Sequence, residues 1–537
     1  MRTLPVIFGL LVLVTAPARA GEPVATERNL VDAALAEHRR AVGIAVDRQA
    51  ATPQADDAEF LRRVTLDLAG RIPTVVEQRT FAAAPAMVRR VELVDRLLAG
   101  PEFPLHFARV LDDWIQRDKH GDEAFVEWLR NSLKSQTTWD AMFRQMLVGP
   151  WDAGGEKGPG AFYKKRAKDL DALTSDTSRA FFGVDITCAR CHDHPLVDDW
   201  KQEHYYGLAS FFHKPQSSGK GSSAGDKNAA ELTFASKRGG QKTARPMFLS
   251  GMTVSIDAPA KDAKPADAAR RAKLVEAALA DDQFFRRSAV NRMWAWFFGR
   301  GLVEPIDQMH SGNPASVPQL LDALADDFAA HGYDLRRLAK QIVTSEVYQA
   351  SNRAVPNQVA PNQTAPNQTA ADLTGIPVAP RLKPLTPRQF VMSLAAAVDP
   401  SRFEAANESE RVKQYAELEK QLAVLLPELD PTVEGYQAGY REALYLANHA
   451  DVQTFVGVGT GELKPGTLVP RLIALKTNDA RIAAAYEALL GRRPTAEEVL
   501  TIARIWNAEA ASPDVVRERV ADLIWALVTS AEFRFNH

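Results

Sequence analysis

The chain has 537 residues, of which 46% are hydrophobic and 25% are charged, with 65 basic and 67 acidic side chains. This is ordinary globular composition, and it excludes a disordered, collagen-like or multi-span membrane protein. The formal net charge of −2 argues against a dedicated nucleic-acid-binding protein, which would carry a clear basic excess.

The first twenty residues have the pattern of a secretory signal peptide. Arg2 is followed by an apolar stretch at residues 6–14 that is too short to cross a bilayer, and residues 18–20 form a small-x-small cleavage site. Cleavage after Ala20 predicts export to the periplasm, the cell surface or the extracellular space. No later stretch is long and apolar enough to span a membrane, so we expect no transmembrane span once the signal is removed.

Apolar residues recur at helical spacing through the first half of the mature chain. Thr74 and Glu77 have the spacing of a capping box, in which each side chain satisfies a free amide of the first helical turn. The aromatic side chains of these helices are expected in the core. Helices are predicted at residues 60–68, 87–98, 106–114, 139–147 and 169–182, and again after Trp200.

One strand-like region, at about residues 230–257, interrupts the helical pattern. Residues 231–234 and 252–256 alternate between polar and apolar, and residues 237–242 between them are typical of a turn. A linker rich in Pro, Ala and Lys follows and marks a domain boundary. We therefore predict a mainly α protein with two helical domains, at 21–258 and 259–537, and a small β element at the end of the first.

Helical spacing resumes after the linker. Residues 290–298 are rich in large apolar side chains and end at Gly299, which predicts a buried helix with a glycine stop. Three copies of a unit beginning Pro-Asn-Gln predict a disordered insert at about residues 352–378. Capping patterns predict further helix starts at Thr386, Thr495 and Ser512.

The chain has only two cysteines, Cys188 and Cys191, and His192 follows the second directly. The spacing C-x-x-C-H is the attachment signature of c-type haem. One helical turn brings the two thiols to two vinyl groups at one edge of the porphyrin, and the adjacent imidazole then reaches the iron. We therefore predict haem c tethered by Cys188 and Cys191, with His192 as the proximal iron ligand.

The sequence does not identify the sixth iron ligand. His194 is too close to His192 to reach the opposite face of the same iron. Asp193 is suited to orient a histidine through its second ring nitrogen, and His194 lies beside it as a further supporting group. Weak candidates for the sixth ligand are Met247, Met252 and His213, together with His204 and His310.

Other functions of the cysteine pair stay open. Cys188 and Cys191 are also compatible with a structural disulfide in a cell-surface structural or interaction protein, or with a redox-active dithiol. A metal-dependent enzyme is a remoter hypothesis, because Cys188, Cys191, His192 and His194 are four potential ligands close in sequence. Their crowding would strain tetrahedral closure, so a distant ligand would be needed. No hydrolase motif or P-loop is present.

Several blocks of the chain resemble a known pair of domain families. Residues 60–74, and the block CARCHDHP together with YYGLASFF, resemble the planctomycete-type cytochrome C domain, a domain of unknown function. Residues 290–305, 331–335 and 523–536 resemble the planctomycete-specific domain that usually follows it. The resemblance covers nearly the whole mature chain. The resemblance implies a c-type cytochrome. The C-x-x-C-H motif and the signal peptide together predict that the protein acts in electron transfer or as a redox module, with a redox partner protein.

Overall fold

The computed structural model describes residues 29–43, 53–119, 121–149, 158–195, 197–213, 231–235, 239–256, 266–352, 377, 379–404, 407–425, 449–456, 463–506 and 512–537. The predicted signal peptide lies outside these residues, as do most of the linker and nearly all of the insert predicted at 352–378. Within the described residues, no helix combines the length and the apolar character that crossing a membrane requires.

The described part of the chain is mostly helical, which confirms the predicted mainly α class. The first half contains α1 (Leu30–Ala41), α2 (Asp57–Ala69), α3 (Val75–Ala83), α4 (Arg89–Ala99), α5 (Glu102–Gln116), η2 (Arg117–Lys119), α6 (Glu123–Lys134), α7 (Trp139–Leu147), α8 (Ala161–Arg166), α9 (Leu170–Thr177), η3 (Ser178–Phe182), η4 (Thr187–Arg190), α10 (Gln202–Ala209), β1 (Leu232–Ala235) and β2 (Gln241–Ala244).

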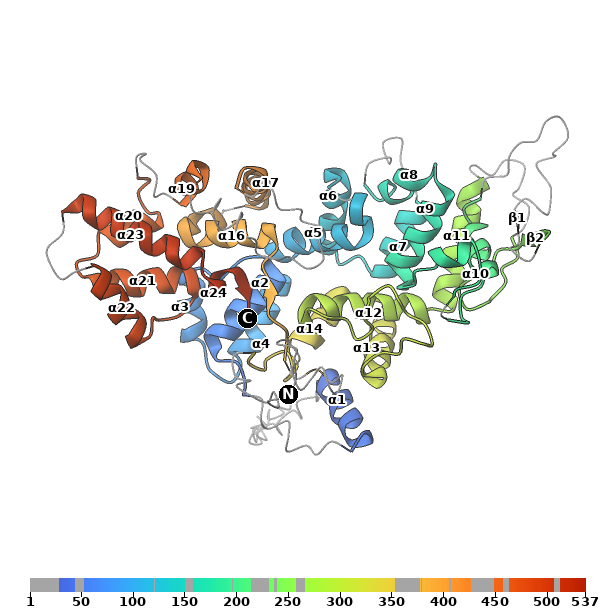
Figure 1. The fold of residues 1–537 in the computed structure, drawn as a ribbon, viewed down its shortest axis with the longest axis horizontal. Coiled ribbons are helices and arrows are strands. Elements are labelled where there is room, and N and C mark those ends of the chain that lie inside the picture. The colour runs from blue at the N-terminus through green and yellow to red at the C-terminus, as the bar shows by residue number, and fades with distance from the viewer. Residues whose placement is uncertain are drawn as a thin grey trace, which may run out of the picture.

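The second half is helical as well, apart from two short strands. It contains α11 (Ala266–Ala280), α12 (Gln283–Phe298), α13 (Pro318–Ala330), α14 (Leu335–Val343), β3 (Lys383–Pro384), α16 (Pro387–Val398), η5 (Pro400–Phe403), α17 (Glu408–Leu425), α19 (Ala450–Val456), α20 (Leu468–Ile473), α21 (Asn478–Leu490), α22 (Ala496–Trp506), α23 (Pro513–Val528), α24 (Ala531–Arg534) and β4 (Phe535–Asn536). Figure 1 shows an elongated molecule, with α2 near its middle, α7 to α11 towards one end and α20 to α23 at the other.

Several helices begin or end at the residues that the capping patterns in the sequence predicted. Thr74 and Glu77 form the capping box of α3. Thr386 and Ser512 accept backbone amides at the starts of α16 and α23. α12 ends at Gly299, whose φ of 74° lies in the left-handed region that glycine adopts without a steric penalty.

The β element differs in detail from its prediction. β1 pairs antiparallel with β2 at residues 241–244, which begins inside the segment predicted as a turn. Residues 252–256, predicted as the second strand, form a single isolated bridge within the described residues. Gly239 and Gly240 both have positive φ, so the chain reverses before residue 241. β2 is mostly exposed, and therefore has no hydrophobic alternation to mark it in the sequence.

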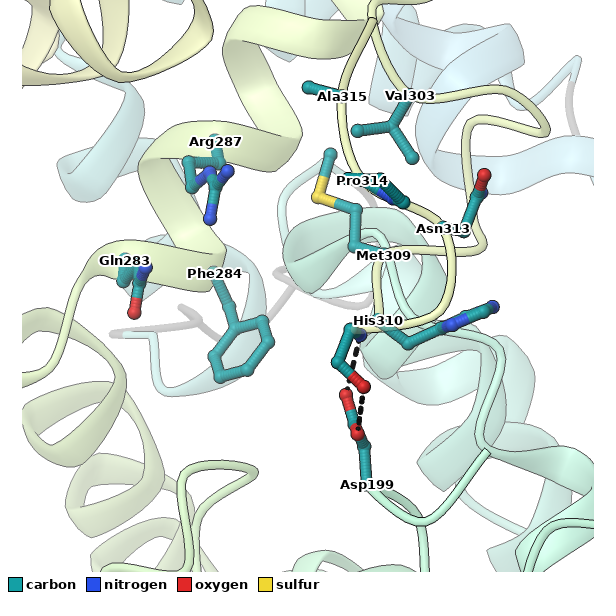
Figure 2. Close-up of a pocket in the computed structure, with 11 residues that line it drawn as sticks. Asp199, Gln283, Phe284, Arg287, Val303, Met309, His310, Asn313, Pro314 and Ala315 are labelled. Atoms are coloured by element: carbon teal, nitrogen blue, oxygen red, sulfur yellow. Dashed lines mark hydrogen bonds between the residues drawn. The ribbon is translucent and has the colours of Figure 1, made fainter. Parts of the chain in front are cut away.

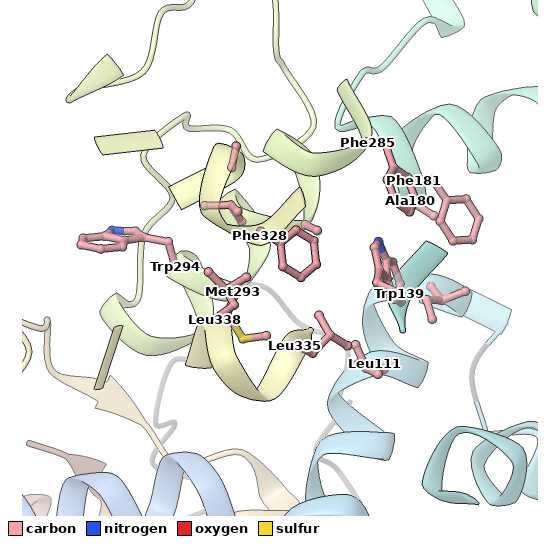
Figure 3. Packing of buried hydrophobic residues seen from close by; sticks show 14 of the residues in the cluster. Leu111, Trp139, Ala180, Phe181, Phe285, Met293, Trp294, Phe328, Leu335 and Leu338 are labelled. Carbon is pink, nitrogen blue, oxygen red and sulfur yellow. The ribbon is translucent and has the colours of Figure 1, made fainter. Parts of the chain in front are cut away.

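Two hydrophobic clusters form the core of the described residues. The first extends in sequence from Val31 to Tyr348, and so includes residues on both sides of the predicted boundary at 258. Figure 3 shows part of it, where the Trp139 ring lies 5.9 Å from that of Phe181 and 6.3 Å from that of Phe285. The expected place of these aromatic side chains in the core is confirmed. The division into two domains stays a prediction.

α2 contributes to both clusters. Its Phe60 belongs to the first cluster and its Leu66 to the second, which otherwise consists mainly of residues after 384. Asp67 accepts hydrogen bonds from Lys383 of β3 at 2.7 Å and from Asn536 of β4 at 2.8 Å. β3 and β4 pair with each other in a second small sheet. The sequence did not predict this sheet, because strands of two residues carry no alternation.

Candidate functional site

The cysteine loop, residues 187–195, carries the C-x-x-C-H motif. It begins with the 3₁₀ turn η4, which Cys191 follows directly. Ala189 in this turn is fully buried, whereas Cys188 and Cys191 are exposed and carry free thiols. Side chains three residues apart lie above one another on a 3₁₀ helix. The two thiols therefore share the outward face of one turn.

His192 is half-buried, and the backbone of its own loop holds its ring. Nδ1 lies 2.6 Å from the carbonyl oxygen of Asp193, which is the distance of a hydrogen bond that Nδ1 donates. With the proton on Nδ1, the other ring nitrogen, Nε2, carries a lone pair and is the one able to bind a metal ion. Nε2 has no hydrogen-bond partner among the described residues.

Asp193 and His194 connect the cysteine loop to the helix that follows. The Asp193 carboxylate accepts the backbone N–H of Gln202, the first residue of α10, at 3.1 Å, and so satisfies a free amide of the helix start. The backbone N–H of His194 donates to the carbonyl of Trp200 at 2.7 Å. The contact that orients His192 therefore comes from the Asp193 carbonyl, and the carboxylate has a different partner.

A hydrogen-bonded group beside the loop holds Arg190, and the sequence did not single it out. Arg190 donates to the carboxylate of Asp171 on α9 at 2.5 Å, and the Tyr205 hydroxyl donates to the other oxygen of that carboxylate at 2.5 Å. Burial, followed by the Asp171 carboxylate, raises the pKa of Tyr205. The adjacent Tyr206 stacks on Phe234 of β1 with 4.0 Å between ring centroids. The two tyrosines thus link α10 to α9 and to the β hairpin.

Three of the predicted candidates for a sixth iron ligand, Met247, Met252 and His213, lie after the hairpin or just beyond α10. The other two are His204, on α10, and His310, in the segment between α12 and α13. Met247 donates its backbone N–H to the carbonyl of Gly207, in the second turn of α10. Met252 is partly buried against the first cluster. His213 lies beyond the far end of α10, and the eight residues of this helix extend over about 12 Å. No hydrogen bond or ring contact among the described residues joins any of the three to His192.

A pocket of about 300 Å³ adjoins the cysteine loop (Figure 2). Asp199 lines one side, and the rest is lined by residues at the start of α12 and by Val303 and most of residues 309–315. The Asp199 carboxylate accepts the backbone N–H and the hydroxyl of Ser311 at 2.7 and 2.5 Å. His310 also lines the pocket, and its ring lies 6.4 Å from that of His194. The cysteines and the histidine of the motif do not line the pocket.

The geometry gives no support to a metal site at the motif. The described residues contain no group of three or more His, Cys, Asp or Glu side chains able to hold a metal ion. Cys188, Cys191, His192 and His194 are all described, so this includes the four ligands considered from the sequence. The metal-dependent enzyme stays a hypothesis without an assembled ligand set.

Two protein families match successive parts of the chain. Residues 31–217 match PSCyt2, a protein of unknown function (DUF1549), and residues 270–375 match PSD1, a protein of unknown function (DUF1553). A PSCyt2 region is therefore followed by a PSD1 region, which confirms the resemblance found in the sequence for these residues. The chain matches no curated protein and no solved structure.

The cysteine loop, which lies in the PSCyt2 region, has the donor set that a c-type haem requires. Two free thiols lie on the exposed face of one turn, so neither has to leave a packed core to form a covalent bond. His192 follows them, and its engaged Nδ1 leaves Nε2 for iron. The residues present therefore fit the cofactor that the cytochrome-type resemblance implies.

Proposed function

We propose that this chain is an exported c-type haem protein that acts in electron transfer or as a redox module. Cys188 and Cys191 form the two thioether bonds to haem, and His192 is the proximal ligand. The observation that carries the proposal is that Cys188 on η4 and Cys191 directly after it both expose a free thiol, next to a histidine whose Nδ1 already has a hydrogen-bond partner. A redox partner protein supplies or accepts the electron.

Bound haem supplies one-electron chemistry at its iron. The protein's own part is to present and orient the donors. The Asp193 carbonyl accepts a hydrogen bond from Nδ1–H of His192. This hydrogen bond fixes the tautomer and makes Nε2 a stronger ligand for iron. The Asp193 carboxylate bonds the start of α10, and Arg190 is held by Asp171, so contacts at both ends of the motif restrain the loop.

Export is part of the proposal. Haem attachment of the c type takes place in an exported compartment, and the signal-peptide pattern of residues 1–20 directs the chain there. Two exposed thiols in an oxidising compartment oxidise readily unless another reaction consumes them. Thioether formation consumes both thiols. This explains why Cys188 and Cys191 are exposed in the fold.

The test is expression of the full chain in a bacterial host that has c-type haem maturation, followed by denaturing electrophoresis and a haem stain. We expect a stained band for the wild-type chain and none for Cys188→Ser/Cys191→Ser, because only a covalent adduct survives denaturation. His192→Gln should keep part of the stain but change the visible spectrum, since the proximal ligand is lost. An unstained wild-type band, from a host that stains a control cytochrome c, would overturn the proposal.

A further inference from the structure

The segment just before the cysteine loop pairs with a loop of the PSD1 region. The backbone N–H of Asp185 donates to the carbonyl of Asp307 at 2.6 Å, and that of Met309 donates to the carbonyl of Gly183 at 3.0 Å. Val184 and Gln308 form an antiparallel bridge between these two contacts. The chain is thus fixed to the PSD1 region three residues before the first cysteine.

Side-chain contacts extend this pairing to Thr187, which precedes the first cysteine. The largely buried Asp307 carboxylate pairs with Arg292, which donates to the carbonyl of Arg179 at 2.7 Å. Arg179 in turn pairs with Asp185 at 3.0 Å and donates to the hydroxyl of Thr187 at 2.7 Å. Thr187 is the first residue of η4 and directly precedes Cys188. These hydrogen bonds therefore connect the PSD1 region to Thr187, the residue before the first cysteine.

The same PSD1 loop also holds the chain after the motif. Asp199, four residues beyond the cysteine loop, accepts both the N–H and the hydroxyl of Ser311 (Figure 2). His310, the preceding residue, lies next to His194 within the cysteine loop. Residues 307–311 thus contact both flanks of the motif, although they are more than 100 residues later in sequence.

We propose that residues 307–311 position the cysteine loop, so that the thiol site is built jointly by the PSCyt2 and PSD1 regions. Asp307 and Ser311 are the positioning residues, one for each flank. A short 3₁₀ turn has weak internal hydrogen bonds, and in this loop the cysteines on either side of Ala189 are exposed. Contacts at the flanks of the loop therefore determine how firmly the two thiols are held on the same side of the turn. The consequence for haem rests on the proposed function, whereas the consequence for the thiols does not.

The test uses the full chain in its haem-free, reduced form and phenylarsine oxide as the probe. This trivalent arsenical forms two As–S bonds to a thiol pair and releases one water, so its affinity reports how well the two thiols are held together. We expect Ser311→Ala and Asp307→Asn each to weaken binding by about tenfold, because each loses a hydrogen bond to a charged group. Ser311→Thr keeps the hydroxyl and should bind like the wild type.

The matched control is Asp326→Asn, which removes an exposed carboxylate of the PSD1 region far from the motif in sequence, and should leave arsenical affinity unchanged. Circular dichroism checks that each variant is folded. If Asp307→Asn does not fold, exposed Ser311 still tests the second flank. Wild-type affinity in folded Ser311→Ala and Asp307→Asn would overturn the positioning role.

The haem-loaded protein provides a second readout. Ser311→Ala should shift the midpoint potential of the haem relative to the wild type, whereas Asp326→Asn should not. A wild-type chain without haem, whose variants nonetheless lose arsenical affinity, would refute the proposed function but keep the positioning role. An unchanged potential in the haem-loaded variants, together with unchanged arsenical affinity in their haem-free forms, would refute the positioning role but keep the proposed function.

Discussion

α2 and the cysteine loop both lie in the PSCyt2 region, and both carry motif blocks of the family, yet their polar residues are placed in opposite ways. Arg62, Arg63 and Asp67 of α2 are at most 1% exposed, whereas Cys188 and Cys191 are exposed. Buried charges are tolerated only where partners satisfy them. The comparison indicates that the charged residues of α2 hold parts of the fold together. It also indicates that the reactive side chains are those of the cysteine loop.

The partners of the α2 charges come from distant parts of the chain. Arg63 donates to the carbonyl of Tyr348 at 2.6 Å, and the Tyr348 hydroxyl donates to Asp67 at 2.7 Å. Lys383 and Asn536 complete the group around Asp67. Burial raises the pKa of Asp67 and lowers that of Lys383, and their mutual contact opposes both changes. One helix turn thereby fixes the PSD1 region and the C-terminal strand.

The largest effect is expected from Asp67→Asn, which keeps the shape of the side chain but removes its charge. Lys383 then stays largely buried without its counter-charge, and the free energy of unfolding should fall by about 3–5 kcal/mol. Urea denaturation followed by circular dichroism measures this. Adding Lys383→Met should recover much of the loss, because the unpaired charge is gone. A loss below about 1 kcal/mol would contradict the structural role.

A smaller loss is expected from Gly70→Ala at the end of α2. Gly70 has a φ of 75°, and a Cβ placed there would lie 2.4 Å from Nδ1 of buried His106. Strain and overpacking together should cost about 2–4 kcal/mol, measured by thermal unfolding. The control is Gly43→Ala, where φ is 72° but nothing lies within 4 Å. Its cost should be about 1–2 kcal/mol. Equal costs at the two sites would show that packing around α2 is not tight.

Stability should depend on pH through His106. Burial, with nearby Arg388, lowers the pKa of His106 to about 3 from its ordinary 6.5. As pH falls, His106 is therefore protonated in the unfolded chain at a higher pH than in the folded chain. The contribution of His106 to the free energy of unfolding is complete above pH 6.5 and should be lost by up to about 1.4 kcal/mol per pH unit as pH drops towards 3.

His106→Asn tests this dependence, because asparagine does not titrate. Its unfolding free energy, measured between pH 6.5 and 5.5, should fall less steeply than that of the wild type. This window lies above 4.5, the ordinary pKa of Glu77. Burial opposes the change, but Arg71 and the Thr74 hydrogen bonds lower the pKa of Glu77 in the fold to about 2. An unchanged slope in the variant would refute the neutral, buried state of His106.

The smallest effect is expected at the cysteine loop. In the haem-free chain, Cys188→Ser and Cys191→Ser should each change the free energy of unfolding by less than about 0.5 kcal/mol, because both side chains are exposed. Ala189→Ser is the matched control within the same turn. It buries a hydroxyl and should cost about 1–3 kcal/mol in the same urea measurement. If the cysteine variants lower the free energy of unfolding as much as Ala189→Ser does, the two cysteines have a structural role in the loop.

Local signals in the sequence predicted much of the fold and one part of the site. The Thr74 capping box, the glycine stop at Gly299 and the C-x-x-C-H motif each depend on residues within a few positions of one another. The second strand of the hairpin was misplaced, because an exposed strand of polar residues lacks the alternation that marks a buried one.

The remaining contacts are tertiary and leave no local pattern. Asp67 and Asn536 are 469 positions apart, and Ser311 reaches Asp199 from 112 positions away. Asp171, which holds Arg190 and Tyr205, is one of many acidic residues on helix surfaces, and nothing near it in sequence distinguishes it. Such partners emerge only when distant segments pack together.

The intact mass of the full chain, purified from a host with c-type haem maturation, tests the central claim most directly. We predict the mass of the processed chain plus one haem, with the addition lost in Cys188→Ser/Cys191→Ser. A wild-type mass two hydrogens below that of the bare chain would instead identify a Cys188–Cys191 disulfide. The unmodified mass of two free thiols would contradict the assignment of chemistry to the cysteine loop.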